Sequence, residues 1–362
     1  MEDGSPRSGS QTPAPDALTL LLKQKALELG FDLVGVTSPD PPPHMEVYRA
    51  WIQAGRHGEM DYLSNERALS RRADPRKLLP ECQSILVVAS NYHTPNPPQE
   101  GSRIASYALG DDYHEVLPQR LRRLVSFLES ELVGHVPHRI YTDTGPILER
   151  ELAARAGLGW IGKNTCLINP RRGSYFLLAE VLLGVELVPD VPFTSDHCGS
   201  CRRCVDACPT QCILHDRTLD ATRCISYLTI EHRGDIPIDL RPGIGNWLFG
   251  CDICQEVCPW NLRFAQECRD ADLRPRAETQ SLTSDAVLAS DPLTLQGALR
   301  RSPLRRAKAS GLRRNAAIVL GNQASPESLP VLTQALHNDE DPVVRKHAAW
   351  AFDQAAGREV EG

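Results

Sequence analysis

Eight of the twelve cysteines in this 362-residue chain lie between residues 198 and 258. The first four follow the pattern C-x2-C-x2-C-x3-C-P, and a second run, C-x2-C-x3-C-P, ends at Pro259, with Cys224 standing upstream in place of its first cysteine. In bacterial ferredoxins the fourth cysteine of such a run ligates the other cluster. The spacing therefore predicts two [4Fe–4S] clusters with crossed ligands. One set is Cys198, Cys201, Cys204 and Cys258, and the other is Cys208, Cys224, Cys251 and Cys254.

Structural zinc is the alternative for paired C-x2-C motifs, and the two matched C-P endings favour clusters. The remaining cysteines follow no spacing and are expected to be buried or spare thiols: Cys82, Cys166, Cys212 and Cys268. A secreted disulfide framework is not expected, because the chain is long and its start lacks the apolar segment of a signal peptide. The longest apolar stretch, 175–188, is short and contains two glutamates, so we expect a cytoplasmic protein without a transmembrane helix or membrane partner.

Two clusters transfer electrons one at a time, so a second redox group is needed to receive those electrons. The stretch Gly157-Leu-Gly-Trp-Ile-Gly162 has the G-x-G-x-x-G form, but an expected helix precedes it where a dinucleotide site needs a strand. A phosphate-binding loop is also disfavoured, since Asn164 replaces the required hydroxyl residue. We interpret the stretch as a turn whose backbone closely approaches a partner element or a ligand. Asp112-Tyr-His114 resembles the start of the cobalamin motif D-x-H-x-x-G, but Leu117 replaces its glycine.

Two further features have both a structural and a functional interpretation. Asp143 stands in Tyr141-Thr-Asp-Thr-Gly-Pro146, just before a helix expected over 144–156, where it either caps that helix or donates a proton at the strand-to-helix junction. Residues 292–326 contain seven Arg or Lys and no acidic residue, although the chain carries a net charge of −6. Such a stretch indicates a surface for a phosphate backbone, or else a solvated helix face.

The elements that must position these residues fall into three regions of different composition, which follow a short leader. Residues 1–16 are rich in Ser, Pro and Gly and are expected to form a disordered leader. Residues 17–190 alternate helices and strands and predict an α/β or α+β domain. Residues 191–272 have few core residues and are expected to need metal for stability. In residues 273–362, two similar segments, 312–320 and 344–352, lie 32 residues apart with a helical segment between them, which favours a short HEAT-type solenoid over a chance similarity of two Ala-rich helices.

Five of these segments together resemble the epoxyqueuosine reductases: 141–146, 157–165, 197–210, 223–234 and 245–261. The resemblance extends over nearly the whole chain from about residue 17. It implies a cobalamin-binding catalytic domain related to reductive dehalogenases, a ferredoxin-like domain with two [4Fe–4S] clusters and a HEAT-like tail that binds tRNA. It also implies reduction of the epoxide of epoxyqueuosine at the wobble position of tRNA to queuosine, with electrons passing through the clusters to cobalamin.

The resemblance also assigns roles to individual residues. Asp143 matches the proton donor of the family. Residues in the expected cobalamin surroundings are Lys163, Asn164, Leu167, Ser174, Ser226 and Tyr227. The expected tRNA contacts are Glu231, His232 and Arg233 in a loop and Arg305, Arg306 and Arg313 beneath the anticodon stem. A wobble base that reaches a buried centre must be splayed out of its loop.

Two other functions remain open at this point. One is a reductive dehalogenase-like reductase of a small molecule, which would not need a basic helical tail. The other is a ferredoxin-type electron carrier whose tail binds a protein, and it predicts no bound corrinoid. The electron donor is not identified by the sequence, and a monomer is expected from the resemblance.

Overall fold

The computed structural model describes residues 13–95 and 101–357. Most of the expected leader, residues 1–16, lies outside these ranges, and the first helix, α1, spans Pro15–Glu28. Among the described residues, none of the helices is long and apolar enough to cross a membrane.

A four-stranded sheet forms the centre of the first part of the chain. Its order is β1 (Leu33–Thr37), β2 (Ser84–Asn91), β7 (Phe176–Leu183) and β4 (His138–Tyr141). Every neighbouring pair is antiparallel, which makes this region α+β. All eight residues of β2 are buried, because helices cover both faces of the sheet.

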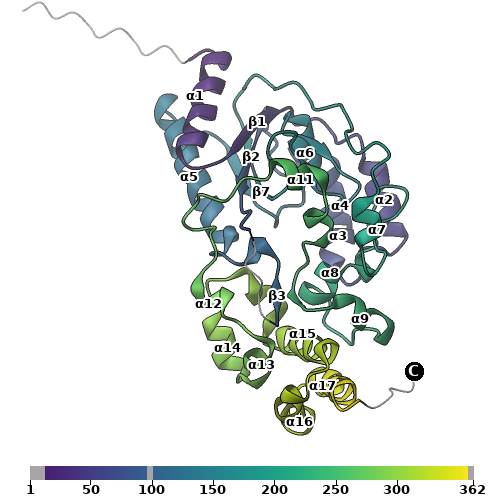
Figure 1. The fold of residues 1–362 in the computed structure, drawn as a ribbon. Helices are drawn as coiled ribbons and strands as arrows, with labels where there is room; N and C mark the ends of the chain where they lie inside the picture. The colour runs from purple at the N-terminus through teal and green to yellow at the C-terminus, as the bar shows by residue number, and fades with distance from the viewer. Residues whose placement is uncertain (1–12, 96–100, 358–362) are drawn as a thin grey trace, which may run out of the picture.

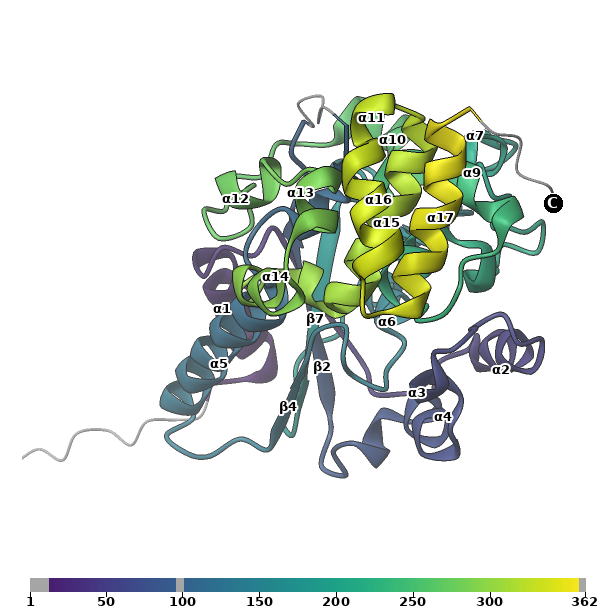
Figure 2. The ribbon, with the colours of Figure 1, turned by 90° about the horizontal axis from the view of Figure 1, so that it is seen from below.

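Helices α1 and α5 (Tyr113–Glu131) cover one face, and α6 (Glu149–Arg155) covers the other (Figure 1). Side chains of β2 alternate between these layers, as the twofold period of a strand requires. Leu86 and Val88 join the core with α1 and α5, whereas Ile85 and Val87 join the core with α6. Helices α2 (Met45–Gln53), α3 (Asp61–Ser64) and α4 (Glu66–Ala73) lie to one side (Figure 2).

Short elements carry the cysteines. They are α7 (Arg203–Ala207), α8 (Ile225–Ile230), α9 (Arg241–Ile244), α10 (Ile253–Glu256) and α11 (Pro259–Phe264). Strand β3 (Arg103–Ile104) pairs in parallel with β8 (Trp247–Phe249) and ties this region to the first. The glycine-rich stretch leads into a small hairpin of β5 (Trp160–Ile161) and β6 (Leu167–Ile168).

The tail consists of α12 (Ala277–Gln280), α13 (Ser284–Ala289), α14 (Pro292–Ala298), α15 (Lys308–Gln323), α16 (Leu329–Asn338) and α17 (Pro342–Ala355). Helices α15, α16 and α17 pack side by side (Figure 2). Gly321 of α15 permits this approach, since a Cβ there would lie 2.5 Å from the Trp350 ring. Leu228 and Phe249 of the cysteine-rich region share one continuous core with Leu312 and Ala316 of α15. The core therefore runs across the boundary predicted at residue 272.

Candidate active site and cluster pockets

The first predicted set of thiols lines a single cavity. Cys198, Cys201, Cys204 and Cys258 border a space of about 290 Å³, where the start of α11 brings Cys258 to the loop 198–204. The Lys163 ammonium donates hydrogen bonds to the carbonyl oxygens of Gly199 at 2.6 Å and Cys201 at 2.9 Å, which fixes this loop. Four thiols around one cavity provide the donor chemistry of a [4Fe–4S] cluster.

The second set gathers against the core that continues into the tail. Cys224 and Cys251 pack against that core. Burial and the neighbouring thiols of Cys224 and Cys208 raise the pKa of Cys251. Thiols in this state must lose their protons when they ligate metal, so cluster binding would release protons. The structure thus brings together the same four cysteines that the spacing groups.

Two of the expected spare cysteines also lie beside this second set. The Cys212 sulfur is 3.4 Å from the Cys208 sulfur, and a hydrogen bond to Cys254 lowers the pKa of Cys166. No spacing signal in the sequence indicates this placement, because it depends on how separate loops fold together. Among the described residues, no three His, Cys, Asp or Glu side chains converge tightly enough for a single metal ion.

Asp143 follows β4 and adopts a left-handed backbone conformation with φ of 58°. Helix α6 begins only at Glu149, later than the predicted start at residue 144, and its N-cap is Leu148. The interpretation of Asp143 as the cap of this helix is therefore wrong. Its own backbone N–H instead donates to Glu149 Oε1 at 2.6 Å, so the first residue of α6 holds the loop that carries Asp143.

The Asp143 carboxylate forms a pair with His114. His114 Nε2 lies 3.4 Å from Asp143 Oδ2, while His114 Nδ1 lies 2.7 Å from Asp112 Oδ1. Burial by itself would lower the pKa of His114, but the hydrogen bond to Asp112 and the nearby Asp143 carboxylate outweigh burial and raise the pKa to about 9. Partial desolvation would raise the pKa of Asp143, but the nearby His114 and the hydrogen bond donated by the Tyr113 hydroxyl at 3.0 Å lower it. At neutral pH the pair therefore carries one proton, located mainly on the histidine.

Arg306 and Glu231, two of the predicted tRNA contacts, lie next to this pair. Its guanidinium donates to Glu231 Oε1 at 2.7 Å and to the Tyr62 hydroxyl at 3.3 Å. The charge of Arg306 also contributes to the lowered pKa of Asp143. Asp143, Arg306 and Glu231 thus belong to one charged site, although they come from three distant parts of the chain.

A buried and a half-buried carboxyl group, Glu180 and Glu149, lie next to the Asp143 loop. Glu180 of β7 pairs in register with Tyr141, is fully buried, and has no hydrogen-bond partner at either carboxyl oxygen among the described residues. Burial raises its pKa well above the ordinary value. Burial and the charge of Asp143 also raise the pKa of Glu149 to about 7. Glu180 is therefore neutral at physiological pH.

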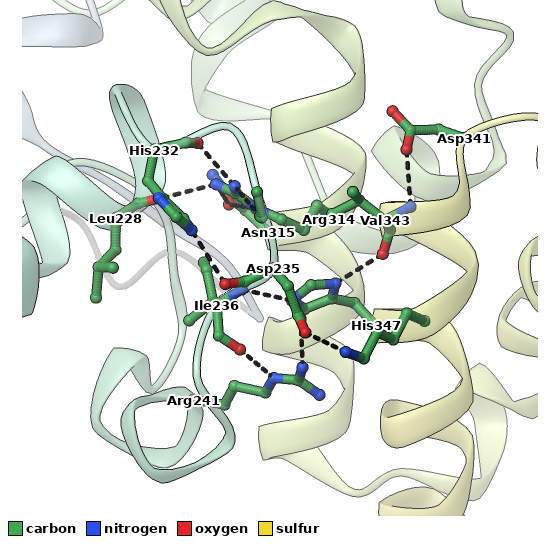
Figure 3. Close-up of polar contacts among 12 residues, drawn as sticks. Leu228, His232, Asp235, Ile236, Arg241, Arg314, Asn315, Asp341, Val343 and His347 are labelled. Carbon is green, nitrogen blue, oxygen red and sulfur yellow. Dashed lines mark hydrogen bonds and ion pairs between the residues drawn. The ribbon is translucent and has the colours of Figure 1, made fainter. Parts of the chain in front are cut away.

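The loop 231–236 is held in place by α15 and α17 (Figure 3). The buried Arg314 guanidinium donates to the carbonyl oxygens of Leu228 at 2.7 Å, His232 at 2.7 Å and Gly234 at 3.0 Å. The Ile236 N–H donates to the buried His347 ring at 3.2 Å. The tail thus supports the loop that carries Glu231, His232 and Arg233.

Several cations of the basic stretch 292–326 form ion pairs or hydrogen bonds with other residues of the chain. Arg305 pairs with Asp112 at 3.0 Å, and Arg313, whose side chain is 12% exposed, pairs with Asp339 at 2.6 Å. Arg314 is buried. Arg300 and Lys308 are exposed and have no carboxylate partner among the described residues. Charge counting overestimated the free cations, because sequence alone does not show which Arg side chains have internal acidic partners.

The residues expected around cobalamin gather near the second set of thiols. Asn164 donates to the Cys254 carbonyl oxygen at 3.4 Å, and Ser174 donates to Gln255 Oε1 at 2.9 Å. Ser226 and Tyr227 follow Cys224 in α8, and the Tyr227 hydroxyl accepts from the Glu59 N–H at 2.7 Å. Leu167 is buried in β6. Lys163, by contrast, contacts the loop of the first set. Ser174, Tyr227 and Lys163 are held by intramolecular bonds, so they shape this region of the protein.

The α+β region, the two thiol sets and the helical tail define an iron–sulfur protein with a HEAT-type extension. Residues 197–261 match the profile of a 4Fe-4S double cluster binding domain, and residues 301–359 match that of HEAT repeats, which confirms both predictions. Residues 72–144 match the profile described as "Epoxyqueuosine reductase QueG, DUF1730".

Relatives and solved structures place the chain more narrowly. It is 39% identical to the epoxyqueuosine reductase of Xanthomonas campestris pv. campestris, over 94% of this chain and 97% of the relative. It is 38% identical to that of Escherichia coli K12, over 93% and 89%. The crystal structure of an epoxyqueuosine reductase with an epoxyqueuosine-modified tRNA-Tyr stem loop is 32% identical and has a TM-score of 0.86, over 93% and 90%. A Bacillus subtilis structure, whose catalytic aspartate loop is swung out of the active site, has a TM-score of 0.83. The chain belongs to the epoxyqueuosine reductase family, as its motifs predict.

Proposed function

We propose that this protein reduces the epoxide of epoxyqueuosine at the wobble position of tRNA and gives queuosine. The observation that carries the proposal is the protonated His114–Asp143 pair beside the second thiol set. Tyr107 lies between the pair and the second thiol set, because its ring is 6.0 Å from that of Tyr113, and burial, Asp143 and Asp252, the neighbour of Cys251, all raise its pKa. A proton source and an electron source thus meet in a chain that belongs to this family.

The reaction requires both. Conversion of an epoxide to an alkene consumes two electrons and two protons and releases water. The departing oxygen needs a proton as the carbon–oxygen bond breaks, and a positioned acid supplies it. Asp143 is held 3.4 Å from His114, so a proton given up by the aspartic acid form is replaced from the imidazolium.

We propose that cobalamin binds next to the second set of thiols, in the region of Asn164, Ser174, Ser226 and Tyr227. The convergence of these residues on Cys254 and Cys224 supports this placement. When bound, the group supplies low-valent cobalt for the reduction. Asn164 and Ser174 would fix the surrounding loops, and Tyr227 would hold the Gly58–Glu59 turn that closes the region.

The proposed substrate is the anticodon stem loop of tRNA. Glu231, His232, Arg233, Arg305, Arg306 and Arg313 remain the proposed contacts. Arg306 and Glu231 lie where a splayed base would meet Asp143, and Arg313 would need to leave Asp339 before it could contact phosphate. We propose a cytoplasmic monomer that receives electrons from an external donor.

The test uses anaerobically prepared protein loaded with iron–sulfur clusters and cobalamin. An epoxyqueuosine-containing anticodon stem loop is incubated with it and a low-potential reductant, and mass spectrometry measures loss of one oxygen atom from the modified base. Turnover with wild type and loss of turnover with Asp143→Asn are expected. Absence of turnover by fully loaded protein would refute the proposed function. Absence of corrinoid binding would favour an electron carrier.

A further inference from the structure

We propose that the surface around the first thiol set, Cys198, Cys201, Cys204 and Cys258, is where electrons enter, and that it docks a small acidic one-electron carrier protein. The inference rests on the proposed function only in requiring that this thiol set holds a redox cluster. It adds a partner and a docking surface for the unidentified electron donor.

The two thiol sets differ in their surroundings. The cavity of the first set is bordered by Lys163, Arg263 and the exposed His197, and only a small apolar cluster packs against it. The second set lies against the main core, on the side of Tyr107 and the Asp143 site. The first set therefore borders the cavity through which electrons would enter, and the second set lies on the side of the site of reduction.

The rim of the first cavity carries unneutralised positive charge. Arg203 and Arg263 are exposed and have no carboxylate partner among the described residues. Lys163 contacts only backbone carbonyl oxygens. The nearby carboxylates are already paired, Asp206 with Arg202 at 3.0 Å and Asp196 with Arg217 at 2.6 Å. Two exposed arginines, Arg263 at the cavity and Arg203 next to Cys204, together with the half-buried Lys163 ammonium, therefore place net positive charge here, although the whole chain carries a net charge of −6.

This charge selects the kind of partner. A cationic rim on an acidic protein attracts and orients an acidic carrier, and such steering raises association rates by about 10- to 1,000-fold. Leu262, which is 68% exposed, stands beside Arg263 on α11 and supplies an apolar contact at this rim. Complexes that transfer electrons use small interfaces, for which a few cations around a small apolar contact suffice.

The surface is separate from the one proposed for tRNA. Helix α11 lies beside the sheet and α6 in the upper part of Figure 1, and α15, α16 and α17 form the lower end of the molecule. A carrier bound at α11 leaves the tail accessible, so both partners can bind at once. This arrangement suits a reaction in which electrons are delivered while the RNA is bound.

The experiment compares two electron sources with the loaded enzyme. Under anaerobic conditions, stopped-flow absorbance follows cluster reduction by reduced flavodoxin, an acidic carrier, and separately by the methyl viologen radical, a small cation. For Arg203→Glu and for the double variant with Arg263→Glu, the second-order rate with flavodoxin should fall at least about tenfold and lose most of its salt dependence. The rate with methyl viologen, normalised to iron content, should not fall. Arg122→Glu, which changes an exposed arginine on α5, is the matched control and should leave both rates unchanged.

Each other outcome overturns the proposal in a recognisable way. Unchanged flavodoxin rates in the variants would show that this surface does not dock the carrier. An equal fall with methyl viologen would show that the arginines support the cluster and not the partner. Weaker stem-loop binding by the variants, with unchanged flavodoxin rates, would assign the surface to RNA. Because cluster reduction is read without tRNA, failure of the proposed epoxide reduction would be seen separately.

Discussion

Replacing Asp143 by Asn should change the pH dependence of the reaction as well as its rate. In the wild-type protein, Asp112 and Asp143 raise the pKa of His114 from its ordinary 6.5 to about 9. One pKa unit corresponds to about 1.4 kcal/mol, so the two carboxylates together favour the imidazolium by about 3 kcal/mol after the opposing effect of burial. This stabilisation is fully present below pH 6.5 and is lost as the pH rises through about 9.

Asp143→Asn removes one of the two anions and keeps the shape of the side chain. The pKa of His114 should then fall to a value between 6.5 and 9, because only Asp112 still favours its charged form. The single-turnover rate should drop by about 100- to 10,000-fold, the usual contribution of a general acid. The remaining activity should decline at a lower pH than in wild type, since His114 loses its proton earlier.

The assay is single turnover on the modified stem loop from pH 6 to pH 10 with clusters already reduced. His114→Gln should abolish the high-pH decline, and Asp112→Asn should shift it in the same direction as Asp143→Asn. The reasoning is refuted if the decline near pH 9 keeps its position in Asp143→Asn, or if His114→Gln retains the wild-type rate. Because the two groups interact strongly, the measured values belong to the pair.

Three further predictions follow from the buried groups. Cys258→Ala should remove about half of the bound iron and leave the second cluster's electron paramagnetic resonance signal, and loss of all iron would contradict two independent thiol sets. Glu180→Gln should leave the free energy of unfolding nearly unchanged at about pH 4, where Glu180 is neutral in both the folded and the unfolded chain. Above the ordinary pKa of 4.5, wild-type Glu180 must take up a proton on folding, so the variant should already be more stable than wild type at pH 7, and its advantage should grow by up to about 1.4 kcal/mol per pH unit towards the folded-state pKa; chemical denaturation at several pH values measures this. Arg314→Ala should lower the free energy of unfolding by about 3 kcal/mol or more, because it leaves three carbonyl oxygens without their donor. It should also weaken stem-loop binding, and an unchanged affinity would show that the loop 231–236 does not need this support.

Local spacing carried most of the information about the clusters. Three cysteines separated by two residues are confined to one short segment, and the second C-P ending marks where α11 starts. The strands were predictable for a related reason, since a continuous apolar run such as β2 can only be buried on both faces. The antiparallel pairing was not predictable, because strand order depends on how the connecting helices pack.

The active site depended on the tertiary structure. His114 and Asp143 each stood in a recognisable motif, but their pairing requires α5 and the end of β4 to meet across the sheet edge. The start of α6 was misplaced because Thr-Gly-Pro is typical of a helix start, whereas here the chain first turns to present Asp143. The sequence by itself determined which residues can bind iron, because ligand spacing acts over a few residues of backbone. Only the tertiary structure decided which cations are free and which carboxylates share a proton, because those properties arise between side chains brought together from distant parts of the chain.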